Sequence, residues 1–315
     1  MAATSETIPY WQLISLSHTD GVGNPLADVV ASVAFFLLLR WAEHQDRQEE
    51  AFADFENFEF TPKIPRRLGW RRILDVFDNH SRYESELSRT FERQALADEI
   101  VPELCNIGGN PLADTIAQAA YCYDARKLSW NLLQKTFDFA NSLEIETAKG
   151  REEASAIFDV LVEEAVGKTR YSGQFFTPQP IARLMAEIAN PKAGESVYDP
   201  CFGLGGLLET AGDFILDDAE SLSTGSYSST VNNTLHGVEL SPQAFLVGLT
   251  RLILTGFNQP RLRLGDALEQ DFYNTRQFDI VLAAPPIGAK IKDSWRYRQY
   301  PLKTSSSENL FLQHI

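Results

Sequence analysis

The pattern of apolar and polar positions changes character near the middle of the chain. The first 160 residues or so have the pattern of helices, and an apolar run at 29–39, in which Ser32 is the single polar residue, predicts one helix that is buried nearly all round. Beyond them, short apolar segments alternate with helical ones. That alternation is typical of a parallel, doubly wound sheet. We therefore predict a helical N-terminal domain, 1–165, and an α/β domain, 166–315.

Two helix starts in the first half carry the same signal. Asn24-Pro25 and Asn110-Pro111 each place asparagine at the N-cap and proline at the first helical position. The string Gly-Asn-Pro-Leu-Ala-Asp surrounds both, but its flanks do not match. We interpret it as recurring capping chemistry rather than a duplication. A further amphipathic helix is predicted over 152–166, followed by a short link from Gly167.

The elements of the second half follow from its apolar segments and turns. Helices are predicted at 180–188, 206–216, 242–255 and 307–315, and strands at 196–199, 235–240, 261–265 and 278–283. The segment 221–233, rich in Ser, Thr and Asn, is expected to be a solvated surface loop. A doubly wound domain normally adds several more strands. We therefore expect this domain to be incomplete at its C-terminal end.

Composition narrows the class of protein. The hydrophobic fraction of 44% is ordinary for a globular chain, and the longest apolar run is about half of a membrane span. Neither a signal peptide nor metal-ligand cysteine spacing is visible, which predicts reduced thiols in the cytoplasm, no metal and no membrane. The net charge of −15 leaves no general basic face for DNA. Any DNA contact is expected to be local or to come from a partner chain.

A glycine-rich turn follows the predicted strand 196–199. It reads Asp-Pro-Cys-Phe-Gly-Leu-Gly-Gly from Asp199 and leads into a helix, at the edge of the sheet where such folds bind ligands. Gly203 and Gly205 let the backbone approach a ligand closely, and the helix start offers free N–H groups. The Asp199 carboxylate can accept from a positively charged amine.

Two further acids end the next strands. Glu239 is placed to take both hydroxyls of a ribose, and Asp266 could accept from an adenine amino group. Each acid alone would be a solvated loop residue or a helix cap. Three at successive strand ends, after a glycine turn, predict a cofactor site. No lysine follows the glycines, which favours a nucleoside without phosphates.

The remaining motifs carry a family resemblance. Gly-Gln-Phe-Phe-Thr-Pro ends at Pro178, Pro285-Pro286 ends the fourth strand, and Leu-Phe-Leu-Gln-His ends at His314. With the glycine turn and the acids, they resemble the modification subunit of type I restriction-modification systems, which belongs to the gamma-order adenine-N6 DNA methyltransferases. The likeness is strong over roughly 150–315. In the helical first half it rests on length, position and helix content.

The resemblance implies a Rossmann-like, S-adenosylmethionine-dependent methyltransferase domain. It implies double-stranded DNA as substrate, a separate specificity subunit as partner, and a possible homo-oligomer within a complex. The residues that would line the cofactor pocket are Phe176, Thr177, Asp199, Cys201, Gly203, Gly205, Glu239 and Asp266.

The base-holding loop departs from the family pattern. The family carries Asn or Asp, then Pro-Pro, then Phe or Tyr; here the loop is Ala284-Pro285-Pro286-Ile287. An adenine amine is a poor nucleophile, so losing the side-chain acceptor costs on the order of a hundred- to a thousandfold in rate. Losing the stacking ring removes about 1–3 kcal/mol of base binding. We expect turnover to be weak or abolished.

A basic, aromatic segment follows at 290–303. It interleaves three aromatic residues with basic ones, a combination that suits contact with a nucleic-acid strand. An alternative is a solvated connecting loop. The basic residues proposed to bind DNA are Lys290, Lys292, Arg296 and Arg298.

Three hypotheses about function remain open. The first is a DNA adenine-N6 methyltransferase, and the second is an inactive cofactor-binding scaffold or regulator in a DNA-modification complex. The third is methylation of another amine or amide, such as a protein glutamine or an RNA base. The Gly-Gln-Phe-Phe-Thr-Pro string argues against the third.

Overall fold

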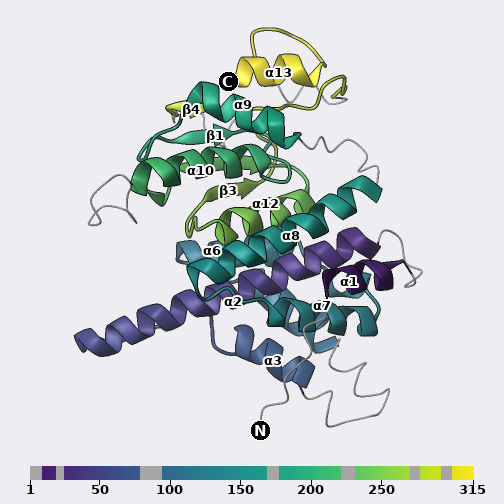
Figure 1. The fold of residues 1–315 in the computed structure, drawn as a ribbon, viewed down its shortest axis with the longest axis vertical. Coiled ribbons are helices and arrows are strands. Elements are labelled where there is room, and N and C mark those ends of the chain that lie inside the picture. The colour runs from purple at the N-terminus through teal and green to yellow at the C-terminus, as the bar shows by residue number, and fades with distance from the viewer. Residues whose placement is uncertain are drawn as a thin grey trace. The chain divides into compact units, whose positions relative to one another are not determined.

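The chain forms two compact units, Met1–Thr169 and Arg170–Ile315. The computed structural model describes residues 9–18, 25–78, 94–168, 177–220, 231–269, 277–291 and 300–315 (Figure 1). Within these ranges no helix has both the length and the apolarity that a bilayer crossing requires.

Every described element of the first unit is helical, as predicted. The elements are α1 (Tyr10–Ser17), α2 (Pro25–Glu56), α3 (Trp70–Asp78), the π-helix η2 (Ala95–Ile100), α5 (Val101–Leu104), α6 (Pro111–Tyr121), the 3₁₀-helix η3 (Ala125–Lys127), α7 (Trp130–Ser142) and α8 (Ala148–Lys168).

Helix α2 forms the centre of the first unit. Its apolar run is buried on all sides, as predicted, and Phe36 lies against the rings of Phe77 and Phe137 at centroid distances of 5.7 and 5.6 Å. The helix continues beyond this run to Glu56. The pattern of apolar positions did not predict that extension, because the added turns are rich in Glu, Gln and Ala. These residues favour helix by propensity without forming a buried stripe.

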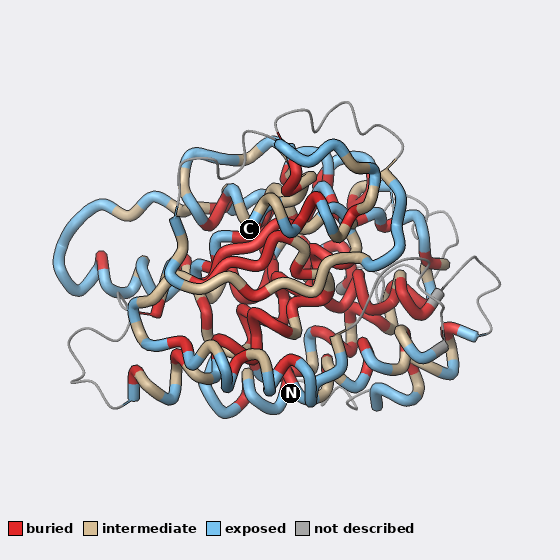
Figure 2. Tube along the Cα trace, turned by 90° about the horizontal axis from the view of Figure 1, so that it is seen from above, coloured by how far each residue is buried: buried red, intermediate tan, exposed pale blue. Residues whose placement is uncertain are grey.

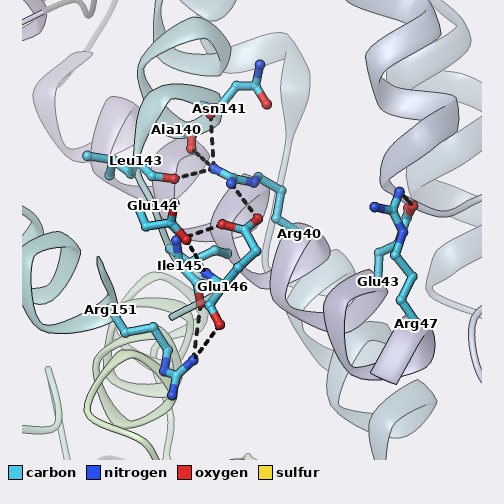
Figure 3. A network of polar contacts seen from close by, with 10 residues as sticks. All are labelled: Arg40, Glu43, Arg47, Ala140, Asn141, Leu143, Glu144, Ile145, Glu146 and Arg151. Carbon is cyan, nitrogen blue, oxygen red and sulfur yellow. Dashed lines mark hydrogen bonds and ion pairs between the residues drawn. The ribbon is translucent and has the colours of Figure 1, made fainter. Parts of the chain in front are cut away.

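Arg40 joins α2 to the end of α7 (Figure 3). Its Nη1 lies 2.7 and 2.6 Å from the carbonyl oxygens of Ala140 and Leu143, and its Nη2 lies 2.7 Å from Glu146 Oε1. Partial burial alone would raise the pKa of Glu146, but hydrogen bonds from the Ile145 N–H and from Arg40 hold it at about 2. A buried guanidinium thus satisfies the carbonyl groups that a helix end leaves open.

The helix starts and ends of this unit test the capping predictions. The Asn110 side chain accepts from Ala113 N at 2.9 Å, which confirms the cap of α6. The corresponding cap at Asn24 lies outside the described residues. Helix α8 runs to Lys168, so the prediction of a link beginning at Gly167 was wrong. Glycine costs only about 1 kcal/mol near a helix end, which does not interrupt a helix whose other face is packed.

The second unit is built on a parallel sheet of order β3-β2-β1-β4. Its two central strands, β1 and β2, are buried (Figure 2), whereas the outer strands β3 and β4 are partly exposed. The elements are α9 (Gln179–Ala189), β1 (Val197–Asp199), α10 (Gly206–Glu220), β2 (Leu235–Glu239), α12 (Pro242–Leu254), β3 (Arg261–Leu264), β4 (Ile280–Val281) and α13 (Ser307–His314).

Helices cover both faces of this sheet. Helix α10 lies against β1, α9 and α12, and α12 lies against β2 and β3. On the other face, Leu310 and Phe311 of α13 form one apolar cluster with Tyr198 of β1 and Val238 of β2. The two central strands, β1 and β2, are buried between these helices, as in other parallel sheets, whereas β3 at the edge alternates exposed arginines with leucines. The predicted Rossmann-like α/β fold is confirmed.

Two predictions for this unit need correction. The fourth strand, expected over 278–283, is only Ile280–Val281. It is paired on one side, to β1, and the residues after it turn toward the site described below. Of the segment predicted as a solvated loop, 221–230 lies outside the described residues, and Val231 is buried. A single apolar anchor in a polar segment is too short a signal to predict burial.

Candidate cofactor and base-holding site

The order of the strands places a crevice between β1 and β4. From β1 the chain moves to β2 and β3 on one side, whereas β4 pairs with the other side of β1. Ligands of open parallel sheets bind at such a reversal, outside the carboxyl ends of the strands. The glycine turn follows β1 and the Ala284 loop follows β4. The topology therefore brings these two predicted motifs to the same edge.

The glycine turn has the backbone that only glycine adopts easily. Gly203 and Gly205 have φ of 58° and 86°. A Cβ on Gly205 would lie 3.0 Å from Gly248 Cα, so the turn also packs directly on the backbone of α12. Arg251, buried in α12, donates from Nη1 to the Leu204 carbonyl at 3.3 Å. Helix α12 thus fixes the shape of the turn through these two contacts.

Asp199 is the most buried acid of the site. Burial raises the pKa of its carboxyl to about 7, the hydrogen bond from the Cys201 N–H at 2.9 Å opposes that shift, and the charge of Glu239 adds to it. The ionised form of such a buried carboxylate is strongly stabilised when a cation approaches, because the cation replaces the solvation that burial removed.

Glu239 joins three parts of the site. Its Oε2 accepts from Gly203 N at 2.9 Å and its Oε1 from Ser241 N at 2.7 Å. Burial raises the pKa of this carboxyl, although the two hydrogen bonds lower it. The side chain therefore holds the glycine turn and the start of α12 together. Each oxygen of a carboxylate has a second lone pair, so these bonds leave acceptor capacity.

Asp266 lies one strand further along the edge. It follows β3, and its Oδ1 accepts from Leu268 N at 3.0 Å, which closes a local turn. The neighbouring Gly265 N donates to the Glu239 carbonyl at 2.9 Å, so the ends of β2 and β3 are joined. The three predicted acids therefore stand in a row at successive strand ends.

The base-holding loop lies against the glycine turn. The backbone N–H of Ala284 hydrogen-bonds the Cys201 thiol, whose pKa is raised by burial and by Asp199. Ala284 is half-buried, whereas Ile287 is 75% exposed. A small pocket joins both motifs and is lined by Thr177, Asp199, Cys201, Phe202, Leu204, Gly206, Leu207 and Ala284.

Ser307 anchors the far end of this loop. Its buried hydroxyl is within hydrogen-bond distance of the Pro286 carbonyl and 3.2 Å from the Ala289 carbonyl. Two backbone hydrogen bonds, Ile291 N to Ser305 O and Ser307 N to Ala289 O, join the same segments. In the sequence, the serines at 305–307 have the signature of helix caps. Ser306 does cap α13 through Asn309 N, but Ser307 positions the loop.

Replacing Ser307 by Ala is expected to loosen the loop. One neutral hydrogen bond contributes about 1 kcal/mol, so amide exchange at 287–291 should speed up roughly fivefold while exchange in β1 stays unchanged. Hydrogen-exchange mass spectrometry measures both segments at once. Ser305→Ala is the matched control, because only the backbone of that residue contacts the loop. Equal exchange in both variants would contradict the anchoring role.

Several predicted residues lie outside the described part of the chain. These are Phe176, Lys292, Arg296 and Arg298. Lys290 is described; it is exposed and pairs in a short antiparallel bridge with Ser306. In the described ranges, no group of three or more His, Cys, Asp or Glu side chains has the arrangement of a metal site.

Sequence reasoning missed two residues that shape the site. Arg251 had a signal, since it is the single charged residue in the apolar helix 242–254 and a buried charge needs a partner. No signal in the sequence pointed to the role of Ser307, because a serine at the start of a helix is also the usual residue for a cap.

Together, the parallel sheet with helices on both faces and the glycine turn after β1 define a doubly wound α/β unit. Comparison with known proteins gives the family. Residues 151–315 match the N-6 DNA methylase family, just over half of the chain, so the protein belongs to that family. The predicted resemblance is confirmed.

Individual relatives agree with this assignment. The chain is 25% identical over 279 residues to the type I restriction enzyme EcoEI methylase subunit of Escherichia coli. The matched region covers 86% of this chain and 54% of that protein. The chain thus spans about half the length of that relative.

Two solved structures share the fold. A chain from a type I R-M system matches with a TM-score of 0.75 at 24% identity, covering 97% of this chain and 60% of that one. The modification subunit of a putative type I restriction enzyme from Vibrio vulnificus YJ016 matches with a TM-score of 0.70 at 20% identity, covering 99% and 68%.

Proposed function

We propose that this protein is the methylating subunit of a DNA restriction-modification or related defence system. It would transfer a methyl group from S-adenosylmethionine to the N6 amino group of adenine in duplex DNA. The observation that carries the proposal is that Asp199, the glycine turn and Ala284, which precedes Pro285-Pro286, line one pocket, and that Glu239 is hydrogen-bonded to the same turn. Membership of the N-6 DNA methylase family supports it.

The residues at this edge fit a cationic nucleoside. Two buried acids, Asp199 and Glu239, both with raised pKa, would be stabilised by the positive charges of S-adenosylmethionine. We assign Asp199 to the amino group, Glu239 to the ribose hydroxyls and Asp266 to the adenine amine. Phe176, Thr177, Cys201, Gly203 and Gly205 would complete the pocket. When bound, the cofactor supplies an electrophilic methyl group.

Cofactor affinity is expected to depend on pH through Asp199. Below pH 7 the free carboxyl is largely protonated, and a cation must displace that proton to bind. Affinity should therefore rise about tenfold per pH unit up to pH 7 and level off above it. Titration calorimetry from pH 5.5 to 8.5 measures this slope. An Asp199→Asn variant should bind weakly with no such slope, and the same slope in that variant would contradict the assignment.

The loop after β4 would hold the flipped adenine, but with fewer contacts than the Asn/Asp-Pro-Pro-Phe/Tyr loop of the family provides. The Pro286 carbonyl accepts from Ser307, so the Pro285 carbonyl is the acceptor that we assign to one amine hydrogen. Ala284 offers no acceptor for the other hydrogen, and Ile287 offers no ring for stacking. We therefore expect the cofactor site to be competent and the transfer step to be slow.

Product analysis tests the proposed reaction. Duplex DNA of mixed sequence is incubated with the protein, its specificity subunit and cofactor carrying a labelled methyl group, and the nucleosides are separated by mass. Label is expected only in N6-methyladenine. Label in cytosine, RNA or protein would contradict the proposal.

DNA binding by this chain alone is expected to be weak and non-specific. With a net charge of −15, phosphate contact must come from the segment 290–303 and be strongly salt-dependent. Removing the positive charges of Lys290, Lys292, Arg296 and Arg298 should abolish it, as measured by fluorescence anisotropy of a labelled duplex. Tight, sequence-specific binding without a second subunit would show that no separate specificity protein is needed.

A second candidate function rests on the same loop. A protein that kept the acids and the glycine turn but carries Ala284 and an exposed Ile287 could serve as a cofactor-binding scaffold or regulator. The first experiment of the Discussion separates the two candidates.

A further inference from the structure

Three exposed phenylalanines lie at the C-terminal end of α2, two in its last turns and one just after it. Phe52, Phe55 and Phe58 are 60, 80 and 54% exposed. The rings of Phe52 and Phe58 meet edge to face, with their centroids 6.1 Å apart. This part of the helix extends past the other labelled helices of its unit (Figure 1). Large aromatic side chains gathered in this way are typical of a surface that another molecule covers. We call it the α2 aromatic patch.

The patch continues the buried face of the helix. The separations between Leu37, Trp41, Phe52 and Phe55 are sums of helical steps of three and four residues, which puts these side chains along one side of α2. Leu37 and Trp41 are buried in the unit, whereas the phenylalanines lie beyond it. At Asn57, with φ of 58°, the chain reverses and returns Phe58 to the same side. The core-facing side of α2 is thus longer than the core that covers it.

Acidic side chains surround the patch. Asp54, Glu56 and Glu59 are exposed and neighbour the three phenylalanines in the sequence. The nearby basic residue Lys63 is already paired with Glu49. An acidic surface of this kind repels nucleic acid and anionic lipid. It also disfavours a second copy of this chain, whose net charge is −15.

We propose that the α2 aromatic patch binds a basic, amphipathic helix of a partner protein. Apolar side chains of that helix would pack on the three rings, and its Lys or Arg residues would pair with Asp54, Glu56 and Glu59. Apolar anchors give such a contact its affinity, and complementary charge selects the partner. The surface belongs to the first unit, whereas the residues of the proposed methyl-transfer site belong to the second.

Model helices of defined charge test the proposal. The probe is a synthetic Leu/Lys peptide with leucine at helical positions i, i+3, i+4 and i+7, and its affinity is measured by anisotropy against the intact chain. Phe52→Ser with Phe55→Ser should weaken binding about tenfold or more, as for the loss of central anchors. Asp54→Lys with Glu56→Lys should weaken it too. A matched Leu/Glu peptide should not bind.

The control is an exposed apolar surface that has no unpaired acidic residues in the positions next to it. Leu184 and Ile188 of α9 are 55 and 78% exposed, but Arg183 and Glu187 beside them form an ion pair. Leu184→Ser with Ile188→Ser should leave Leu/Lys binding unchanged. Circular dichroism melting checks that all variants fold.

Three results would overturn the proposal. One is equal binding of the Leu/Lys peptide to the wild type and to the Phe52→Ser, Phe55→Ser variant. Another is a loss of duplex DNA binding in that variant, which would assign the patch to nucleic acid. The third is a wild-type dimer in sedimentation that becomes monomeric in the variant, which would assign the patch to self-association.

Discussion

Replacing Ala284 by Asn and Ile287 by Phe is expected to raise methyl transfer to adenine by about a hundred- to a thousandfold. The Asn side-chain oxygen would accept one amine hydrogen at the point where positive charge develops. The Phe ring would add about 1–3 kcal/mol of stacking on the flipped base. Transfer of labelled methyl to mixed-sequence DNA, with the specificity subunit present, measures the rate.

Two controls make this experiment decisive. Ala283→Asn places the same side chain one residue earlier and should not restore the rate, and Asp199→Asn in the restored protein should remove it again. Robust methylation by the unaltered chain would show that another group supplies the acceptor. A restored variant that binds cofactor but stays inactive would favour the scaffold function.

Replacing Arg40 by Met is expected to lower the free energy of unfolding by about 2–4 kcal/mol, because the buried guanidinium donates to two carbonyls and to a half-exposed carboxylate. Methionine retains much of the apolar volume but leaves the Ala140 and Leu143 carbonyls and the Glu146 carboxylate without their donor. Urea unfolding followed by circular dichroism measures the change. Arg47→Met is the control, because its pair with Glu43 is on the surface and should contribute less than about 1 kcal/mol.

The same interaction has a pH signature. Because the pKa of Glu146 is lowered to about 2, the stability that it contributes is fully present above its ordinary pKa and is lost as pH falls toward 2. The wild type should therefore lose its advantage over Arg40→Met in acid. A constant difference between the two from pH 7 to pH 3 would contradict this role of the ion pair.

Local signals in the sequence predicted most of the α/β unit. The strand, glycine turn and helix around Asp199 are found within a few residues of their predicted bounds, because apolar runs and glycines act locally. The predicted length of β4 was wrong, because the extent of a strand depends on the neighbouring strand, which the residues of β4 do not specify. The extension of α2 to Glu56 was missed because its charged turns carry no buried stripe.

The contacts that shape the site could not be predicted, because they join distant segments. Ser307 reaches the Pro286 carbonyl across 21 residues, and Arg251 reaches the Leu204 carbonyl across 47. Glu239 was predicted as a ligand for ribose, but its bonds to Gly203 and Ser241 also make it a support of the turn. A strand-end acid has the same sequence pattern in either role.

The central claim is that Asp199, Glu239 and the glycine turn form a site for S-adenosylmethionine. Titration calorimetry of that cofactor into the wild type, Glu239→Gln and Glu187→Ala tests it most directly. We predict one-to-one binding at micromolar to sub-millimolar affinity for the wild type and for Glu187→Ala, a surface control. Glu239→Gln should weaken binding about ten- to a hundredfold, because an amide cannot replace a carboxylate that accepts on both oxygens. No binding to the wild type, or unchanged binding in Glu239→Gln, would contradict the account.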